Sequence, residues 1–370
     1  MKYFVYRYNP VSVGVLANPN LAVVCPKELK EKYKSIGFED NNIFTIDCFN
    51  MPELFLFFKA RNDISDIFTL DEGLIHIVGI LKAIFTHDKQ ALEVSYAYKD
   101  KKIMRLKLDN VINQPTLLSS EELLPDSFVI KPRREASGKG VQILSKIPDY
   151  FSNEDYILET VEQFDTMYTC DGIAVDGKIE YFFSHEYIGN ILDIKKNYYN
   201  IIRTNSNYLK EDFIKRLKKM TQTVLNHLGT DNIHPFHAEF FYKKEKDELS
   251  FCEIGKRFGG GNIPLLIKQS FEVDVLTAYW NLINGNKFSD CHNEKPYRIS
   301  LTIAIFQNGH HQDPPNLPVD YTYFREYAEK SNTAKSLEDL RYLMSFNVKD
   351  QVDFEKQFEI LKDYLNEQGE

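Results

Sequence analysis

Two glutamates, Glu239 and Glu253, are placed by the sequence so that they could act together. They lie in HAEFFYKKEKDELSFCEIGKR, where apolar and polar side chains alternate on both sides of the polar KKEKDE, a pattern typical of an antiparallel hairpin. A turn centred near Lys246 puts the two carboxylates opposite each other on one face, about 5 Å apart. Opposed like charges are destabilising unless a cation neutralises them, and hard oxygen ligands favour Mg²⁺, with Mn²⁺ as an alternative ion. We therefore predict a metal site; the alternative is a solvated sheet face screened by nearby lysines.

The residues after the second glutamate are suited to phosphate and carboxylate groups. Arg257 comes four residues after Glu253, and its guanidinium offers a planar fork for the oxygens of either group. The run Gly259-Gly260-Gly261 follows, and consecutive glycines suit a place where the backbone approaches a ligand closely. We therefore expect Arg257 and the three glycines to border a ligand that carries phosphate or carboxylate oxygens. His237 shares the face of Glu239 and is expected either to contact substrate or metal or to be a packed core histidine.

A second glycine-rich stretch, FVIKPRREASGKGVQIL, could be a phosphate loop. It lacks the usual P-loop spacing, because no glycine lies five residues before Gly138, and Gly140 rather than Ser or Thr follows Lys139. The next residues, Val141 to Leu144, are typical of a strand and not of a helix. The stretch therefore predicts a strand, a flexible loop and a second strand. Its backbone amides could cradle phosphates, with Lys131 and Lys139 as positive charges.

Composition narrows the class of protein. The 370 residues are enough for two or three domains, and a net charge of −9 argues against nucleic acid or an anionic membrane as a partner. The five cysteines are scattered and never in a CxxC spacing, which indicates reduced thiols in a cytoplasmic protein, with neither a disulfide framework nor a metal cluster. The opening run MKYFVYRYNP has no apolar stretch of signal-peptide or membrane-helix length. His310 and His311 are adjacent without ligand spacing and predict a loop.

The elements that must position these residues follow from periodicity. Residues 1–99 alternate strand-like and helical runs, which predicts a small parallel-sheet domain, and they contain no Gly-x-Gly-x-x-Gly fingerprint. Asp176-Gly177 between two alternating runs predicts a hairpin, and YRISLTIAIF predicts a strand. Helical patterns cover four later segments: Glu211–Leu228, Ile263–Asn284, Leu337–Tyr342 and Asp353–Gln368.

In this order the motifs resemble the ATP-grasp superfamily over most of the chain. KDKKIMRLKL and FVIKP are similar to the segments that carry the family's two nucleotide lysines, EASGKGV resembles its mobile lid, and YILETVEQF its adenine-binding hinge. HAEF and EIGKR resemble the strands with its two metal glutamates and its phosphate-facing arginine. The resemblance implies nucleotide contacts from Lys101, Lys131, Ser137, Gly138, Lys139, Gly140, Glu159, Thr160, Val161, Glu162 and Asp165. It places His185 beside the active site, and Arg203 at the γ-phosphate or a substrate carboxylate unless Arg203 is a surface residue.

The fold that the resemblance implies is α/β and α+β, in three subdomains. These are a parallel α/β domain at 1–99, a hairpin-containing lid subdomain with a linker helix at 100–187, and an α+β subdomain with the metal and substrate site at 188–370. The implied activity is ATP-dependent ligation of a carboxylate to an amine through an acyl phosphate, releasing ADP and phosphate. Lys131, Arg203 and Arg257 would assist this chemistry.

The resemblance also narrows the substrate class. Gly255 stands where many members have a further Asn ligand for Mg²⁺, a variant that is commoner among ligases joining amino acids, so L-amino acid ligases are the nearest resemblance. The expected partners are ATP and two small molecules, a carboxylate and an amine, and a homodimer is left open beside a monomer. A carboxylating or purine-pathway enzyme and a catalytically silent nucleotide sensor remain the alternatives.

Overall fold

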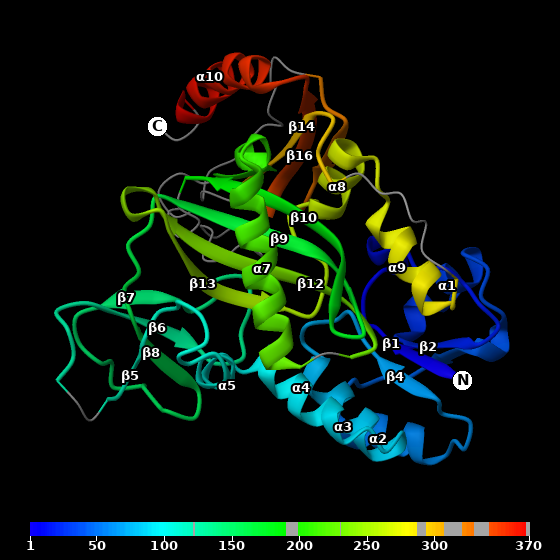
Figure 1. Ribbon diagram of the computed structural model, residues 1–370. Helices are drawn as coiled ribbons and strands as arrows, with labels where there is room; N and C mark the ends of the chain where they lie inside the picture. The colour runs from blue at the N-terminus through cyan, green and yellow to red at the C-terminus, as the bar shows by residue number, and fades with distance from the viewer. Residues whose placement is uncertain are drawn as a thin grey trace.

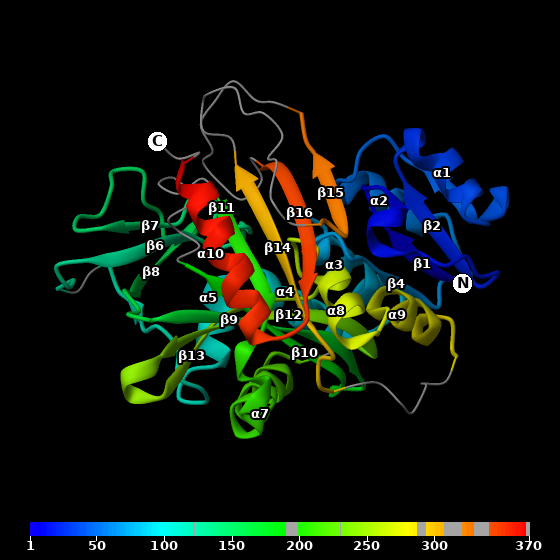
Figure 2. The same cartoon turned by 90° about the horizontal axis from the view of Figure 1, so that it is seen from above.

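The computed structural model describes residues 1–120, 123–189, 199–229, 231–286, 294–306, 320–328 and 340–367. These residues form three β-sheets. The N-terminal sheet and a small sheet lie at opposite ends of a large one (Figures 1 and 2).

The N-terminal sheet is parallel. Its strands β1 (Lys2–Val5), β2 (Leu21–Cys25), β3 (Ile43–Thr45) and β4 (Asp66–Phe68) lie in the order β3-β2-β1-β4. Helices α1 (Lys30–Ser35), α2 (Met51–Lys59) and α3 (Ile75–Phe85) follow β2, β3 and β4, which confirms the predicted alternation of strands and helices. The run LAVVC of β2 is buried throughout, because α1 covers one face of the sheet while α2 and α3 cover the other.

The small sheet is antiparallel and contains the glycine loop. Helices α4 (Lys89–Lys99) and α5 (Lys101–Lys107) lead into it, and Asp100 caps α5 by accepting hydrogen bonds from the amides of Lys102 and Ile103. The strands β5 (Leu117–Leu118), β6 (Phe128–Pro132), β7 (Gln142–Leu144) and β8 (Tyr156–Thr160) lie in the order β5-β8-β6-β7. Because β6 and β7 flank the loop as an antiparallel pair, the predicted strand, loop and strand are confirmed.

The large sheet is antiparallel and contains both glutamates of the predicted metal site. Asp176 and Gly177 make the predicted turn between β9 (Thr166–Val175) and β10 (Lys178–Ile188), with φ of 48° and 80°. The strand order is β13-β12-β9-β10-β11-β14-β16-β15. Its strands are β9 (Thr166–Val175), β10 (Lys178–Ile188), β11 (Tyr199–Thr204), β12 (Ile233–Lys243), β13 (Glu248–Gly255), β14 (Ile299–Phe306), β15 (Tyr323–Glu326) and β16 (Leu340–Val348).

Helices cover both faces of the large sheet. On one face α7 (Glu211–Leu228) packs over β9 and β12, and α10 (Gln351–Glu367) packs over β11, β14 and β16 (Figures 1 and 2). On the other face lie α8 (Ile263–Phe271), α9 (Val275–Ile283) and the N-terminal sheet. Short 3₁₀ turns occur at Pro10–Val13, Lys27–Leu29, Asp40–Asn42, Ser206–Leu209 and Lys244–Lys246.

The structure confirms two helix predictions and corrects two. The helices at Glu211–Leu228 and Asp353–Gln368 are confirmed as α7 and α10, although α10 begins at Gln351. The single helix predicted at Ile263–Asn284 is wrong, because Glu272 ends α8 in the left-handed region at φ 59° and Asp274 caps a second helix, α9. The helix predicted at Leu337–Tyr342 is wrong from residue 340, where β16 begins.

The remaining sequence predictions concern the histidine pair, the subdomain boundary, membrane helices and the cysteines. His310, His311 and residues 337–339 lie outside the described residues. β9 and β10 pair within the large sheet, although the predicted boundary at 187 assigns them to the small subdomain; the boundaries themselves stay a prediction. Within the described ranges no helix combines the length and apolar character needed to span a bilayer. The cysteines there, Cys25, Cys48, Cys170 and Cys252, are free thiols.

Candidate active site

Glu239 on β12 and Glu253 on β13 face each other, as predicted. The pairing depends on an irregularity that the sequence did not reveal. Phe240 faces Phe251, so the register shifts by one residue between Phe240 and Glu239, and Cys252 is the extra residue. Without that shift Glu253 would lie on the other face of the sheet.

The two carboxylates are a donor set that fits Mg²⁺ only in part. Glu239 Oε1 accepts a hydrogen bond from the hydroxyl of Tyr187 at 2.8 Å, and Glu253 Oε2 lies 3.4 Å from Lys101 Nζ. Burial would raise the pKa of Glu253, but Lys101 and Lys131 lower it to about 2, so it is ionised. In the described part of the chain, no group of three or more Asp, Glu, His or Cys gathers around a metal position. Two hard carboxylates suit Mg²⁺ if phosphate oxygens and water complete its six ligands.

Lys131 lies in a buried charge cluster on the small sheet. Its Nζ is 2.7 Å from Glu159 Oε2, and Arg105 Nε donates to Glu159 Oε1 at 2.8 Å. Burial would lower the pKa of Lys131, but Glu159 raises it above its usual value. Arg105 also donates to the carbonyl of Cys252 at 2.6 Å, which ties the small sheet to the hairpin. Sequence reasoning missed Arg105, although it stands in the KDKKIMRLKL motif.

The residues of the predicted adenine-binding segment differ in their surroundings. Glu159 is 1% exposed and its carboxylate meets two cations, so any reading of the adenine edge there falls to the backbone of Thr160, Val161 and Glu162. Val161 and Glu162 lie in the connection from β8 to β9. Asp165, the expected ribose ligand, accepts a hydrogen bond from the amide of Lys244 at 2.7 Å, at the turn of the hairpin formed by β12 and β13.

The loop between β6 and β7 is held at its base and open at its tip. Arg133 donates to Asp100 from both Nε and Nη2, at 3.0 and 2.7 Å. Lys101 Nζ donates to the carbonyl of Glu135 at 2.6 Å. Ser137, Gly138 and Gly140 have positive φ, and a Cβ at Gly138 would meet nothing within 4 Å. The tip therefore has room to move, and Lys139 is more than half exposed there.

Arg257 reaches from the large sheet to the N-terminal domain. Its Nε donates to the carboxylate of Glu72, in the loop after β4, and its Nη1 donates to the carbonyl of Phe258 at 2.9 Å. Burial would raise the pKa of Glu72, but Arg257 holds it below its usual value. The charge of Arg257 also acts on Glu239 and Glu253, so its guanidinium lies near both carboxylates. Glu72 was not assigned a role from the sequence.

Behind Glu239 lies a second acid that sequence reasoning did not select. Asp171 Oδ1 is 2.7 Å from His237 Nδ1, and Asp171 Oδ2 is 3.5 Å from Nδ1 of the buried His185. Burial would lower the pKa of His237, but Asp171 raises it to about 9. The glycine run closes over this pair, since a Cβ at Gly259 would lie 2.5 Å from Asp171 Oδ1.

The other two glycines differ from Gly259. Gly261 has a φ of 59°, and a Cβ there would lie 2.8 Å from the side chain of Ile202. A Cβ at Gly260 would meet nothing within 4 Å. The close approach expected of the run is thus made at Gly259 and Gly261, against side chains of the protein itself.

Comparison with known proteins bears on the fold. No protein-family model and no curated protein matches the chain. Among solved structures it is similar to an L-amino acid ligase from Bacillus licheniformis, at 12% identity and a TM-score of 0.70, over 98% of this chain and 97% of the other. A carboxyaminoimidazole ribonucleotide synthase from Aspergillus clavatus, complexed with ATP, matches at 10% identity and a TM-score of 0.70, over 99% and 98%.

A phosphoribosylglycinamide synthetase from Anaerococcus prevotii matches at 10% identity and a TM-score of 0.64, over 98% of both chains. The chain has the ATP-grasp fold. The fold class expected from the sequence is therefore confirmed. The likeness covers almost the whole chain, which includes the parallel N-terminal sheet and the two antiparallel sheets. At these identities the likeness extends to the fold alone.

Within this ATP-grasp fold, Arg203 lies apart from the other expected site residues. Strand pairing puts Glu239, Thr169, His185 and Thr204 in one row across β12, β9, β10 and β11. Because side chains alternate along a strand, Arg203 points to the opposite face of the sheet from Glu239. Placing Arg203 at a phosphate or substrate of this site therefore needs correction.

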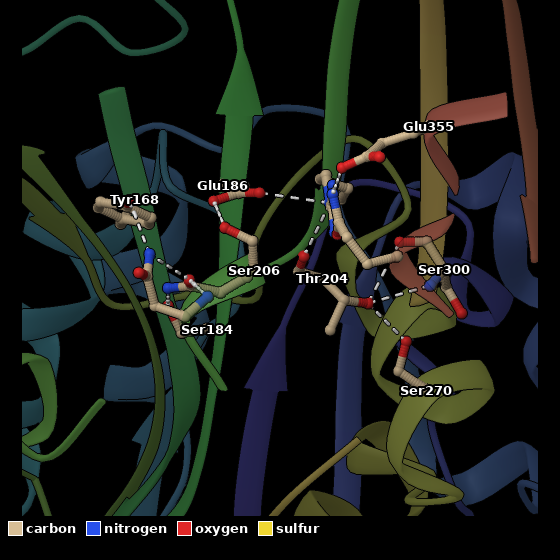
Figure 3. Close-up of polar contacts among 12 residues, drawn as sticks. Tyr168, Ser184, Glu186, Thr204, Ser206, Ser270, Ser300 and Glu355 are labelled. Atoms are coloured by element: carbon tan, nitrogen blue, oxygen red, sulfur yellow. Dashed lines mark hydrogen bonds and ion pairs between the residues drawn. The ribbon is translucent and has the colours of Figure 1, made fainter. Parts of the chain in front are cut away.

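Arg203 lies in a polar cluster under α10. Figure 3 labels Glu186 and Thr204 of this region and Glu355 of α10. Its Nε lies 3.3 Å from Glu186 Oε1, its Nη2 donates to Gln351 at 2.8 Å, and its guanidinium lies 3.7 Å from the centre of the Phe354 ring. Arg203 is only 2% exposed, so the alternative of a surface arginine is also wrong. Its contacts instead hold α10 against the sheet.

We expect Arg203→Met to destabilise the protein without changing the KM of any substrate. The change leaves the carboxylate of Glu186 buried without its cation, which costs about 3–5 kcal/mol. Thermal unfolding measures the loss, and Glu186→Gln combined with Arg203→Met should recover part of it. A raised KM with unchanged stability would return Arg203 to the active site.

We expect the loop tip to be cut by trypsin after Lys139 in the free protein and to be protected by an ATP analogue with Mg²⁺. Nucleotide phosphates would order the exposed tip, while the base is already held by Arg133 and Asp100. Mass spectrometry identifies the cut, which Lys139→Gln should remove. Equal cleavage with and without nucleotide would count against a lid.

Proposed function

We propose that the protein is an ATP-dependent ligase that joins a carboxylate to an amine, with amino acids as substrates. The observation that carries this proposal is a cluster of opposite charges around two opposed carboxylates, Glu239 and Glu253. Three cations outside these two strands act on the charge of Glu253: Lys101, Lys131 and Arg257. A metal–triphosphate complex and a carboxylate substrate together need such a mixture of charges.

A carboxylate is a poor electrophile, so the reaction needs two steps. The carboxylate oxygen first attacks the γ-phosphorus of ATP, ADP leaves, and an acyl phosphate forms. The amine nitrogen then attacks the acyl carbon and loses a proton, phosphate leaves, and the amide remains. Both steps develop negative charge at atoms that the site would surround with cations and backbone amides.

The roles of the residues follow from their places. Lys101, Lys131 and the amides of the loop would hold the phosphates, and Arg257 would stabilise the transferring phosphoryl group and the oxyanion of the second step. Mg²⁺ held by Glu239 and Glu253 would supply further neutralisation of phosphate charge. The loop from Arg133 to Gly140 would exclude water, which otherwise hydrolyses the acyl phosphate.

The preference for amino acids rests on the sequence. Solved structures of the same fold include an amino acid ligase and purine-pathway enzymes, so the fold is compatible with either substrate class. Gly255 at the second position after Glu253 is the feature that favours amino acids.

A screen of phosphate release with ATP, Mg²⁺ and pairs of amino acids tests the proposal. We expect ADP and phosphate to form only when both a carboxylate and an amine partner are present, with a dipeptide detected by mass spectrometry. Dependence on bicarbonate instead would favour a carboxylating enzyme. ATP binding without turnover under every condition would favour a nucleotide sensor.

A further inference from the structure

A buried carboxylate–imidazole pair lies behind Glu239. Asp171 on β9 and His237 on β12 are directly opposed across the two strands, and they are 2% and 8% exposed. The 2.7 Å contact between Asp171 Oδ1 and His237 Nδ1 fixes the orientation of the imidazole ring. The other ring nitrogen, Nε2, is therefore directed away from Asp171.

That second nitrogen meets the expected metal ligand. His237 Nε2 lies 3.6 Å from Glu239 Oε1, and the hydroxyl of Tyr187 donates to the same oxygen at 2.8 Å. Both contacts are made to Oε1, one from β12 itself and one from β10. Because both contacts are to Oε1, Oε2 of Glu239 is the oxygen that could bind a cation.

The pair itself is held from several sides. The hydroxyl of Thr169 donates to Asp171 Oδ2 at 2.7 Å. Gly259 passes so close that a Cβ would lie 2.5 Å from Asp171 Oδ1 and 2.8 Å from His237 Nδ1. The hydrogen bond from Thr169 and the close passage of Gly259 therefore restrict the orientation of the pair.

We propose that Asp171, acting through His237, and Tyr187 are positioning residues that hold Glu239 by Oε1 so that Oε2 meets a divalent cation. This inference rests on the proposed function, because it requires a metal between Glu239 and Glu253. A carboxylate opposite another carboxylate tends to turn away from it. The imidazole of His237 and the hydroxyl of Tyr187, both at Oε1, oppose that tendency, so Oε2 would meet the metal without the side chain first reorganising.

The test is the metal affinity of Asp171→Asn, which keeps the shape of the side chain and removes its charge. We expect the affinity for Mn²⁺, measured by electron paramagnetic resonance with a non-hydrolysable ATP analogue, to fall about 10–100-fold. The matched control is Glu186→Gln, the same chemical change at a buried, cation-paired acid on the opposite face of the same sheet. It should lower the melting temperature and leave the Mn²⁺ affinity as in the wild type.

Tyr187→Phe is the second test. It removes only one hydroxyl, so we expect it to fold even if Asp171→Asn does not. We expect its Mn²⁺ affinity to fall in the same direction, and kcat in both variants to recover as metal is raised. Wild-type Mn²⁺ affinity in both variants, or in Tyr187→Phe if it alone folds, would overturn the positioning role. A wild-type protein that takes up no Mn²⁺ with the nucleotide analogue would instead refute the proposed metal site and thus the proposed function.

Discussion

Replacing Glu253 with Gln should abolish turnover and leave the fold intact. Gln keeps the shape of the side chain, so the pairing of β13 with β12 persists. The proposed metal, however, would lose one of its two protein carboxylates. A bound metal supplies several kcal/mol of charge stabilisation, so kcat should fall on the order of 10³-fold or more. ADP formation at saturating ATP, Mg²⁺ and substrates measures the loss, and circular dichroism checks the fold.

Stability should change little in Glu253→Gln. The pKa of Glu253 is depressed, so its ionised form contributes stability above its unfolded pKa and loses it as the pH falls toward 2. The variant loses this contribution from Lys101 and Lys131 but also the repulsion from Glu239. Glu248→Gln, at the exposed start of the same strand, is the matched control and should turn over normally. Near wild-type turnover of Glu253→Gln at saturating Mg²⁺ would show that the metal assignment is wrong.

The opposition of Glu239 and Glu253 was predictable because the alternation on both sides of KKEKDE identifies the hairpin. Its register was not, since the sequence pattern does not show the extra residue at Cys252. The prediction assumed an unbroken register about Lys246 and obtained the right partners, whereas Lys243 in fact faces Glu248 near the turn. A shift of one residue decides which face a side chain occupies, so this agreement depended on the bulge.

Contacts between distant segments were beyond the reach of the pattern. Arg257 and Glu72 are separated by 185 residues, and His237 and Asp171 by 66. Periodicity tells which residues share a face of one strand, but the order β12-β9-β10 decides which strands are neighbours. The placement of Arg203 was wrong for a related reason. Its segment shows no clean alternation of apolar and polar residues, so the sequence does not tell on which face of the sheet Arg203 lies.

Arg257→Lys should lower kcat by about 10²–10³ while leaving the KM for ATP nearly unchanged, comparable to the loss of an oxyanion-hole donor. Lysine keeps the charge but loses the planar fork. In the structure Nε of Arg257 is engaged by Glu72 and Nη1 by the carbonyl of Phe258. The remaining nitrogen, Nη2, is the donor expected to meet the transferring phosphate, and a lysine cannot make all three contacts at once.

The design of this experiment separates catalysis from domain contact. Interactions that strengthen only in the transition state change kcat when removed, whereas uniform binding changes KM. Glu72→Gln removes the charge from the contact between the N-terminal domain and Arg257 but leaves the guanidinium in place, so its kcat should fall less than that of Arg257→Lys. Arg216→Lys, at an exposed arginine paired with Asp247, is the matched control and should keep the wild-type kcat. If Arg257→Lys and Glu72→Gln lose stability equally and neither changes kcat, Arg257 joins the domains and takes no part in the chemistry.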